Sequence, residues 1–409
     1  MSFNFAYLSG GKLYLKLGQT TVQSIASEFG QAAQQRGFEL QRRNGWKQKS
    51  MMTVGGSGDP KQPDSGVVAV AVQGICSTGA DRLLYSLEAG EVGGIFTLER
   101  SPIALNGSNA TMLESRPKTK EKRLFHSADF KIDRVDFNPT YQLIACAALK
   151  KDGTANIATM PANAVQLSEV TEGDSLDLAP KWIPGTRKAI VFQSAGISRN
   201  NTGQVIEHKH STIEQLDFDL QEVITLASDP KYDLLSPQMA GNGTLYYIRR
   251  PYRPLRQRVA FLQILKDTIL MPSRLMMAVF DWLNYFSRRC TGKALSAAPQ
   301  AQRACSHQVL FLGRLVDVGA EIQRNSKFGD ADSPALVPRS WELIRQYPHQ
   351  EQEAIGRGVL AFDVGLDGQI IYSNGSAVYG VNPGGVAERL VVDRPIDQVA
   401  IINGDNHLN

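Results

Sequence analysis

The sequence predicts an all-β fold, a six-bladed β-propeller, with seven blades as the alternative count. Short apolar runs alternate with turn residues along most of the chain, and they recur in groups of four. In addition, the two ends of the chain hold the parts of one further group. Four-strand units that repeat at about 40 to 50 residues are typical of propeller blades. We therefore expect residues 1–409 to form a single propeller domain.

The clearest four-strand unit lies near the C-terminus. Asp367-Gly368 and Asn374-Gly375 are turn pairs of the kind that close hairpins, and the runs beside them alternate apolar and polar residues. A third turn follows at 382–385. The four strands predicted in this unit cover 359–363, 369–373, 377–381 and 387–392.

The chain before this unit is explained as earlier copies of it. The N-terminal part holds three strands and a short amphipathic helix that is followed by an irregular segment. A flexible Gly-rich loop comes next, and it lacks the Lys-Ser/Thr pair of a phosphate-binding loop. These segments are 3–9, 12–17, 21–26, 29–48 and 55–66. The later units are predicted at 67–115, 135–170 and 176–227, and a fifth begins at 232–249.

Three details of these units are specific expectations. The fourth strand of the second unit is predicted at 110–115, a basic loop at 116–123, and a polar outer loop at 198–210. A lone strand at 397–402 is expected to pair with the N-terminal strands, because closure of the ring removes exposed sheet edges.

The third to sixth units resemble the TolB-type propeller repeat. The residues that carry this resemblance end a first strand beside a proline, turn, and enter an alternating strand. They are Pro180, Trp182, Pro184, Ile190, Phe192 and Ser194, with a weaker copy at Pro237, Asn242, Gly243, Leu245 and Tyr247. The resemblance covers about 125–390 and departs from the family at Gly185-Thr186, where an Asp-Gly turn is usual. It implies a propeller fold.

The fifth unit breaks after Arg250, and we predict a helical insertion over 251–308. Its centre, 259–286, is mostly apolar, but Pro272 divides it and charges interrupt it, so a helical hairpin is expected rather than a membrane-spanning helix. Its candidate docking residues, for a partner or a membrane, are Leu262, Leu265, Leu275, Met276, Phe280, Trp282, Leu283, Phe286, Arg288 and Arg289.

Three interpretations of this hairpin stay open. It packs on the side of the propeller, it docks a protein partner, or it lies in the interface of an anionic membrane. Residues 271–295, together with 249–254, also resemble an insertion in the propeller components of bacterial MoxR-type AAA+ ATPase and von Willebrand A-domain systems. That resemblance implies a scaffold with an AAA+ ATPase and a von Willebrand A-domain protein as partners.

Composition narrows the classes of function. A net charge of +4 is too small at this length to indicate nucleic-acid binding. The four cysteines, Cys76, Cys146, Cys290 and Cys305, include no CxxC pair, so we expect them to be reduced and buried. Because the first residues contain no secretion signal, a cytoplasmic protein is expected, with peripheral attachment to the inner membrane as an alternative.

Candidate chemical sites are weak. His208 and His210 lack a third ligand and are interpreted as part of a surface loop, and Asp330 and Asp332 as an Asx-capped turn rather than a calcium site. The basic loop at Lys118, Lys120, Lys122 and Arg123 is interpreted as solvated.

No catalytic, cofactor-binding or metal-binding residue is assigned, and we expect a non-enzymatic scaffold for protein partners. The alternatives are a peripheral membrane adaptor and a propeller hydrolase or lyase with a metal in its axial channel. The inner-strand carboxylates that could hold such a metal are Asp136, Asp177, Asp233 and Asp363.

Overall fold

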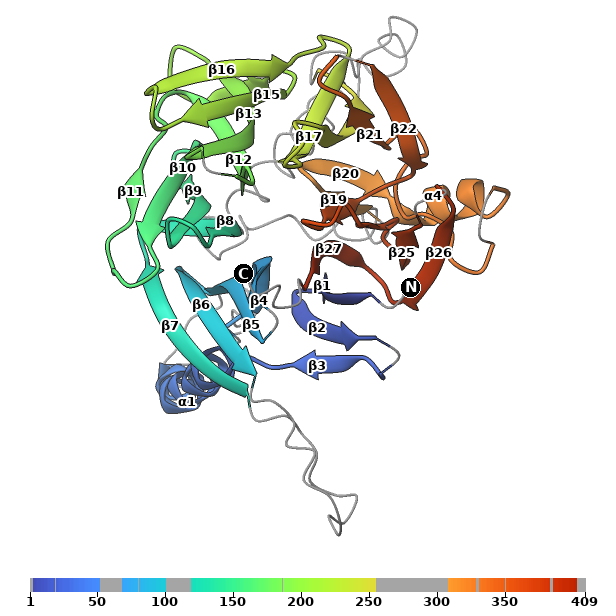
Figure 1. The fold of residues 1–409 in the computed structure, drawn as a ribbon. Coiled ribbons are helices and arrows are strands. Elements are labelled where there is room, and N and C mark those ends of the chain that lie inside the picture. The colour runs from blue at the N-terminus through green and yellow to red at the C-terminus, as the bar shows by residue number, and fades with distance from the viewer. Residues whose placement is uncertain are drawn as a thin grey trace, which may run out of the picture.

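The chain forms a ring of four-stranded antiparallel sheets around a central axis (Figure 1). The computed structural model describes residues 3–18, 20–51, 68–79, 81–100, 119–185, 187–254, 308–328, 331–349, 351–382 and 385–402. Within these residues, four such sheets are separate and a nine-stranded sheet contains two more, which gives blades 1 to 6 and confirms the predicted propeller. One parallel pairing, Ala155 with Leu176, joins the sheets of blades 3 and 4.

Blade 1 closes the ring with strands from both ends of the chain. Its order is β27 (Ile396–Ile401), β1 (Asn4–Ser9), β2 (Lys12–Leu17) and β3 (Gln23–Ile25). The pairing of β1 with β27 runs from Phe5 opposite Ile401 to Ser9 opposite Ile396. The predicted pairing of the C-terminal strand with the N-terminal strands is therefore confirmed.

The other blades follow the chain, each starting with its strand nearest the axis. Blade 2 contains β4 (Val70–Gly79), β5 (Arg82–Ala89), β6 (Val92–Arg100) and β7 (Thr119–Ser127), and blade 3 contains β8 (Phe130–Asn138), β9 (Leu143–Lys150), β10 (Ala155–Pro161) and β11 (Ser168–Glu169). Blade 4 contains β12 (Ser175–Trp182), β13 (Ala189–Arg199), β15 (Thr212–Asp217) and β16 (Glu222–Ala227). Blade 5 contains β17 (Tyr232–Met239), β18 (Leu245–Pro251), β21 (Glu342–Gln346) and β22 (Gln352–Arg357), and blade 6 contains β23 (Ala361–Val364), β24 (Ile370–Ser373), β25 (Ala377–Val381) and β26 (Ala387–Val392).

The hydrophobic core is divided among the contacts between neighbouring blades. Each adjacent pair of blades shares one cluster of buried apolar side chains, and this includes the pair formed by blades 6 and 1. Blades 2 and 3, for example, pack Leu84 and Ile95 against Ile132 and Cys146. Such a core holds each sheet between two others, so apolar runs fit both faces of the central strands.

The fourth strand of blade 2 lies at a different place in the sequence from the one predicted. The outer strand is β7, and it contains most of the segment that was predicted as a basic loop. Lys120 and Lys122 are exposed while Thr119 and Glu121 are partly buried, an alternation that suits an edge strand with one face in water. The many charged residues of this segment therefore led to the wrong prediction of a loop. The strand predicted at 110–115 lies outside the described residues.

Helix α1 (Glu28–Met51) is one continuous helix, longer than predicted, because its sequence is rich in Gln, Arg and Lys and contains no proline. It begins on the outer side of blade 2, where Glu121 accepts hydrogen bonds from Ser27 Oγ at 2.6 Å and from the Phe29 amide at 3.0 Å.

The polar loop predicted at 198–210 is also partly a strand. β13 runs to Arg199 and pairs with β14 (Val205–His208) around a turn that has Gly203 at φ 80°. The alternation of Val205, Ile206 and Glu207 between partly buried and exposed positions explains this extension.

Blade 5 is interrupted between its second strand, β18, and its third strand, β21, so the interruption continues past the predicted boundary at 308. Residues 255–307 lie outside the described residues, and with them the predicted helical hairpin and all ten of its candidate docking residues. The described part of the interruption contains a hairpin of β19 (Gln308–Phe311) and β20 (Arg314–Asp317), followed by α4 (Val318–Asn325). Asp317 caps α4 by accepting a hydrogen bond from the Ala320 amide at 3.0 Å.

Candidate functional site: an axial cavity

The innermost strands surround the axis and line a cavity of about 690 Å³. The strands β27, β4, β8, β12, β17 and β23 contact one another in this order around the ring. Five of these strands contribute lining residues. Next to the sixth strand, β23, the lining residue is Leu360, which directly precedes it. The β19–β20 hairpin adds the stretch from Leu310 to Leu315, so an element outside the six blades also lines this cavity.

A β-bulge brings each of these five inner strands into the cavity wall. The residues at the bulges are Gln73, Arg134, Ala179, Ser236 and Asp397, and all five line the cavity.

Three of the bulged residues have backbone angles that are strained for residues other than glycine, with φ of 47° at Arg134, 53° at Ala179 and 51° at Ser236. Pro180 and Pro237 follow two of the bulges, because a proline lacks the amide hydrogen that an unbulged strand would need. The prolines that marked the sequence repeat therefore mark the cavity wall.

Farther along the inner strands, an ion cluster joins three blades. Nζ of Lys181 in blade 4 lies 3.2 Å from Oδ1 of Asp136 in blade 3 and 3.2 Å from Oδ1 of Asp363 in blade 6. Burial by itself lowers the pKa of Lys181, but the two carboxylates outweigh it and raise this pKa. Burial also raises the pKa of Asp136 by more than Lys181 lowers it. The cluster thus holds its charges in a site that is poorly solvated.

The same carboxylates also bond to the backbone of the next blade. Asp136 accepts a hydrogen bond from the Trp182 amide at 2.8 Å, and Asp363 accepts one from the Ile401 amide at 2.8 Å. Gln398 does the same for the Ile75 amide at 2.7 Å. These inner-strand side chains therefore link consecutive blades.

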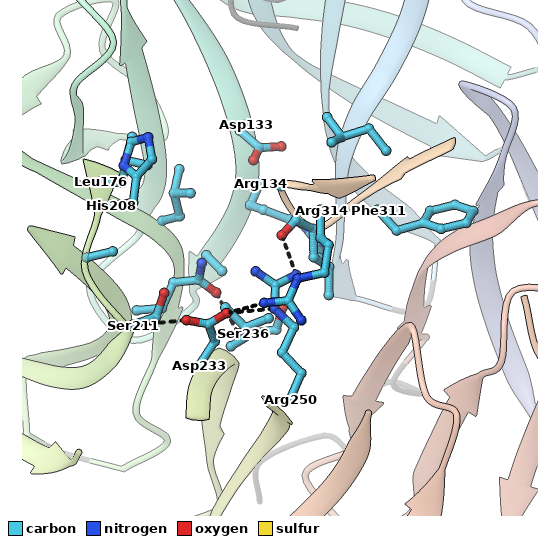
Figure 2. Close-up of a pocket in the computed structure, with 18 of the residues that line it drawn as sticks. Asp133, Arg134, Leu176, His208, Ser211, Asp233, Ser236, Arg250, Phe311 and Arg314 are labelled. Carbon is cyan, nitrogen blue, oxygen red and sulfur yellow. Dashed lines mark hydrogen bonds and ion pairs between the residues drawn. The ribbon is translucent and has the colours of Figure 1, made fainter. Parts of the chain in front are cut away.

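A second ion cluster lies in the cavity wall, where Asp233 of β17 contacts two arginines (Figure 2). Its Oδ2 lies 2.9 Å from Nε of Arg250 and 3.2 Å from Nη2 of Arg314, and its Oδ1 accepts a hydrogen bond from the Ser211 amide at 3.2 Å. Asp233 and Arg250 are buried, with relative exposures of 4% and 7%. One carboxylate is thus shared between two guanidinium groups.

The two arginines also fix the β19–β20 hairpin in place. Arg250 donates from Nη1 to the Leu312 carbonyl at 2.8 Å and stacks over the Trp341 ring at 5.1 Å. Arg314 donates from Nη1 to the Pro251 carbonyl at 2.8 Å. Because burial alone lowers the pKa of Arg250, the nearby Asp233 carboxylate helps keep this group charged.

His208 on β14 also lines the cavity, which the sequence analysis missed by placing it in a surface loop (Figure 2). Burial lowers the pKa of His208 to about 4, and the charge of Arg199 acts in the same direction. The imidazole is therefore neutral near pH 7. His210 lies instead beside Tyr252, with ring centroids 5.9 Å apart.

The carboxylates that were considered for an axial metal each have a partner within the ring. Asp136 and Asp363 bond to Lys181, Asp233 to the two arginines, and Asp177 accepts a hydrogen bond from Ser194 Oγ at 2.7 Å. In the part of the chain that the structure describes, no group of three His, Cys, Asp or Glu side chains is arranged to hold a metal.

The remaining predicted sites give mixed results. Cys76 and Cys146 are buried and free, as expected, while Cys290 and Cys305 lie outside the described residues. Asp330 and Lys118 are also outside them. The carbonyl of Asp332 accepts a hydrogen bond from Arg394 at 3.3 Å. Among the described helices, none is long and apolar enough to cross a membrane.

Comparison with known proteins supplies similarity of fold. No family model and no curated protein matches the sequence. Among solved structures, a chain of the nidogen/laminin complex is 7% identical with a TM-score of 0.48, and the match covers 98% of both chains. TolB from Acinetobacter baumannii is 8% identical with a TM-score of 0.47, over 98% of this chain and 66% of that one.

A gluconolactonase from Xanthomonas campestris is 9% identical with a TM-score of 0.40, over 81% of this chain and 82% of that one. At identities below 10% and TM-scores below 0.5, these structures assign no function to this chain, and none of the comparisons supports the relation to MoxR-type systems.

Proposed function

We propose that this chain is a non-enzymatic binding propeller, a scaffold that presents its surface to protein partners. One observation carries the proposal. The inner-strand carboxylates that a propeller hydrolase or lyase would use for an axial metal are already bonded within the ring, because Asp136 and Asp363 share Lys181 and Asp233 holds Arg250 and Arg314. These side chains link blades and leave a cationic cavity wall, which does not suit a metal ion.

The outer edge of blade 4 gives further support. Among the described strands, β16 is the last of its sheet, and the apolar side chains of Val223 and Ile224 on it are exposed, as is Leu220 in the turn before it. An edge strand with unpaired backbone groups and apolar side chains is a surface on which another chain can pair. The proposed scaffold thus has a described surface for a partner.

The nature of the partners is a further part of the proposal. A role beside an AAA+ ATPase and a von Willebrand A-domain protein rests on the resemblance of 271–295 and 249–254, and the first of these segments lies outside the described residues. Peripheral attachment to an anionic membrane rests on the same segment. Both stay predictions, and the loss of binding when 259–286 is replaced by a short linker would locate either activity there.

Two measurements test the proposal. Elemental analysis of the purified chain should find no transition metal or calcium near one per chain, since a stoichiometric metal would favour the hydrolase or lyase. Affinity capture from the native host should recover stoichiometric protein partners. Comparing the full chain with the 259–286 linker variant and with Val223→Lys/Ile224→Lys assigns the contact to the insertion or to β16. Capture that recovers no stoichiometric partner would contradict the scaffold.

A further inference from the structure

We propose that the axial cavity binds a small organic anion, with its carboxylate or phosphate group at Arg250 and Arg314 and its apolar part along the leucines of the inner strands. This inference is independent of the scaffold function, because it rests on the cavity and its charges alone.

The first argument is the balance of charge in the cavity wall. Among the described lining residues, cations exceed carboxylates: the cations are Arg134, Lys209, Arg250, Arg253 and Arg314, and the carboxylates are Asp133, Asp233 and Asp397. A cavity with an excess of cations at its wall attracts anions, because its low-dielectric surroundings screen the charges less than bulk water does.

The second argument is the geometry of the arginine pair. Arg250 and Arg314 reach Asp233 from two different elements, β18 and β20, and both guanidinium groups have carbonyl partners that fix their position (Figure 2). The two guanidinium groups share the Asp233 carboxylate, and both belong to a wall in which the described cations outnumber the described carboxylates. A fixed pair of this kind suits the oxygens of a carboxylate or phosphate, which guanidinium groups bind through paired hydrogen bonds.

The third argument is the apolar part of the wall. Leu176, Leu178, Leu235 and Leu360 line the cavity from blades 4, 5 and 6, and Phe311 adds an aromatic ring from the hairpin. A volume of about 690 Å³ is within the usual range for sites of small organic molecules. An apolar wall with a few convergent charged groups favours a ligand with an apolar body and one anionic group over an inorganic ion.

The strained bulges give the cavity wall its shape. Ala179 and Ser236 hold positive φ angles beside the cavity, and such strain persists where the surrounding structure enforces it. In the same wall, His208 is neutral near pH 7 and provides polar ring nitrogens without adding charge. The site is therefore built from fixed backbone and fixed arginines, which limits the ordering that a ligand would require.

The test is a binding titration of the full chain with four probes, measured by calorimetry and by the shift in melting temperature. Hexanoate and hexyl phosphate carry the anionic group and the apolar body, 1-hexanol lacks the charge, and inorganic phosphate lacks the apolar body. We expect saturable binding of hexanoate, hexyl phosphate or both, and at least tenfold weaker binding of the other two probes. The first pair of probes also distinguishes carboxylate from phosphate recognition.

Variants locate the binding in the cavity. Arg314→Gln should weaken the binding of the anionic probe about tenfold, the loss expected for one charge-assisted hydrogen bond. Asp233 keeps Arg250 and Ser211 as partners in this variant. The exposed side chains at the mouth are replaced in Lys209→Gln/Arg253→Gln, which should weaken binding several-fold and reduce its salt dependence. Arg82→Gln is the matched control, because Arg82 pairs with Glu99 away from the cavity.

Three outcomes would overturn the inference. They are a lack of saturable binding by either anionic probe, equal binding of 1-hexanol, and unchanged affinity in both the Arg314→Gln and Lys209→Gln/Arg253→Gln variants. If Arg314→Gln fails to fold, as judged by circular dichroism, the double variant decides alone, because its two side chains are exposed. Loss of binding in the Arg82→Gln control would equally count against the cavity.

Discussion

Nζ of Lys181 and Oδ1 of Asp363 lie 3.2 Å apart, although the two residues belong to blades 4 and 6. The same amine contacts Asp136 of blade 3, so a single lysine pairs with carboxylates from two other blades. The free energy of unfolding should therefore depend on the charge of Lys181.

Lys181→Met should destabilise the protein by about 3 to 5 kcal/mol at pH 7, because it leaves the buried Asp136 and Asp363 carboxylates without their cation. Urea unfolding followed by circular dichroism measures this change. Lys150→Met is the control: Lys150 pairs with Glu169 at 2.8 Å near the surface, so the loss should stay below about 1 kcal/mol. Equal effects of the two substitutions would contradict the role of the central lysine.

His208 should make stability depend on pH. Burial lowers its folded-state pKa from 6.5 to about 4, so the unfolded chain takes up a proton first as the pH falls. The contribution of neutral His208 is complete above pH 6.5 and is lost progressively down to about pH 4, with a total of about 3 kcal/mol. His208→Gln should therefore flatten the stability profile in this window. An identical profile in the variant would exclude His208 as the source.

The strained bulge predicts an unusual gain from glycine. Ala179 has φ at 53°, which glycine adopts without the steric cost that an alanine meets, so Ala179→Gly should stabilise the protein by about 1 kcal/mol. Ala145→Gly is the comparison, because Ala145 is a fully buried residue of β9. Its replacement by glycine removes a packed methyl group and raises the conformational entropy of the unfolded chain, and both changes destabilise the fold. Thermal unfolding should shift upward for the first variant and downward for the second.

The latch between the ends of the chain predicts a sharp boundary for truncation. A chain that ends at Pro395 lacks β27, exposes the edge of β1 and loses the links made by Gln398 and Asp363. It should lose cooperative unfolding and tend to aggregate. A chain that ends at Ile402 keeps every described strand and should unfold as the full chain does. Near-ultraviolet circular dichroism and size-exclusion chromatography distinguish the two.

The sequence predicted the ring well because its signals are local. Turn pairs such as Asp367-Gly368 and the alternation beside them identify strands directly, and the unpaired run at the C-terminus implied the latch. The fourth strand of blade 2 was placed wrongly because the charges of β7 resemble those of a loop. An edge strand with one face in water does not need the apolar pattern on which the prediction relied.

The cavity was harder to predict because its residues are distant in the sequence. Arg314 lies in the interruption of blade 5, 81 residues after Asp233, and nothing near either residue signals the other. Arg250 was noticed only as a residue next to the insertion. Pro180 and Pro237 were recognised as repeat markers, but their position beside bulges follows from the hydrogen-bond register, which the sequence does not state.

The interruption of blade 5 leaves and re-enters the sheet at one place. β18 and β21 are adjacent strands, paired from Leu245 opposite Gln346 to Arg249 opposite Glu342, and the last pair is closed by an ion pair of 2.8 Å. The intervening chain therefore starts and ends at two neighbouring strands that pair with each other. Since the two ends of the interruption lie side by side, the length of the chain between them does not set the pairing of β18 with β21.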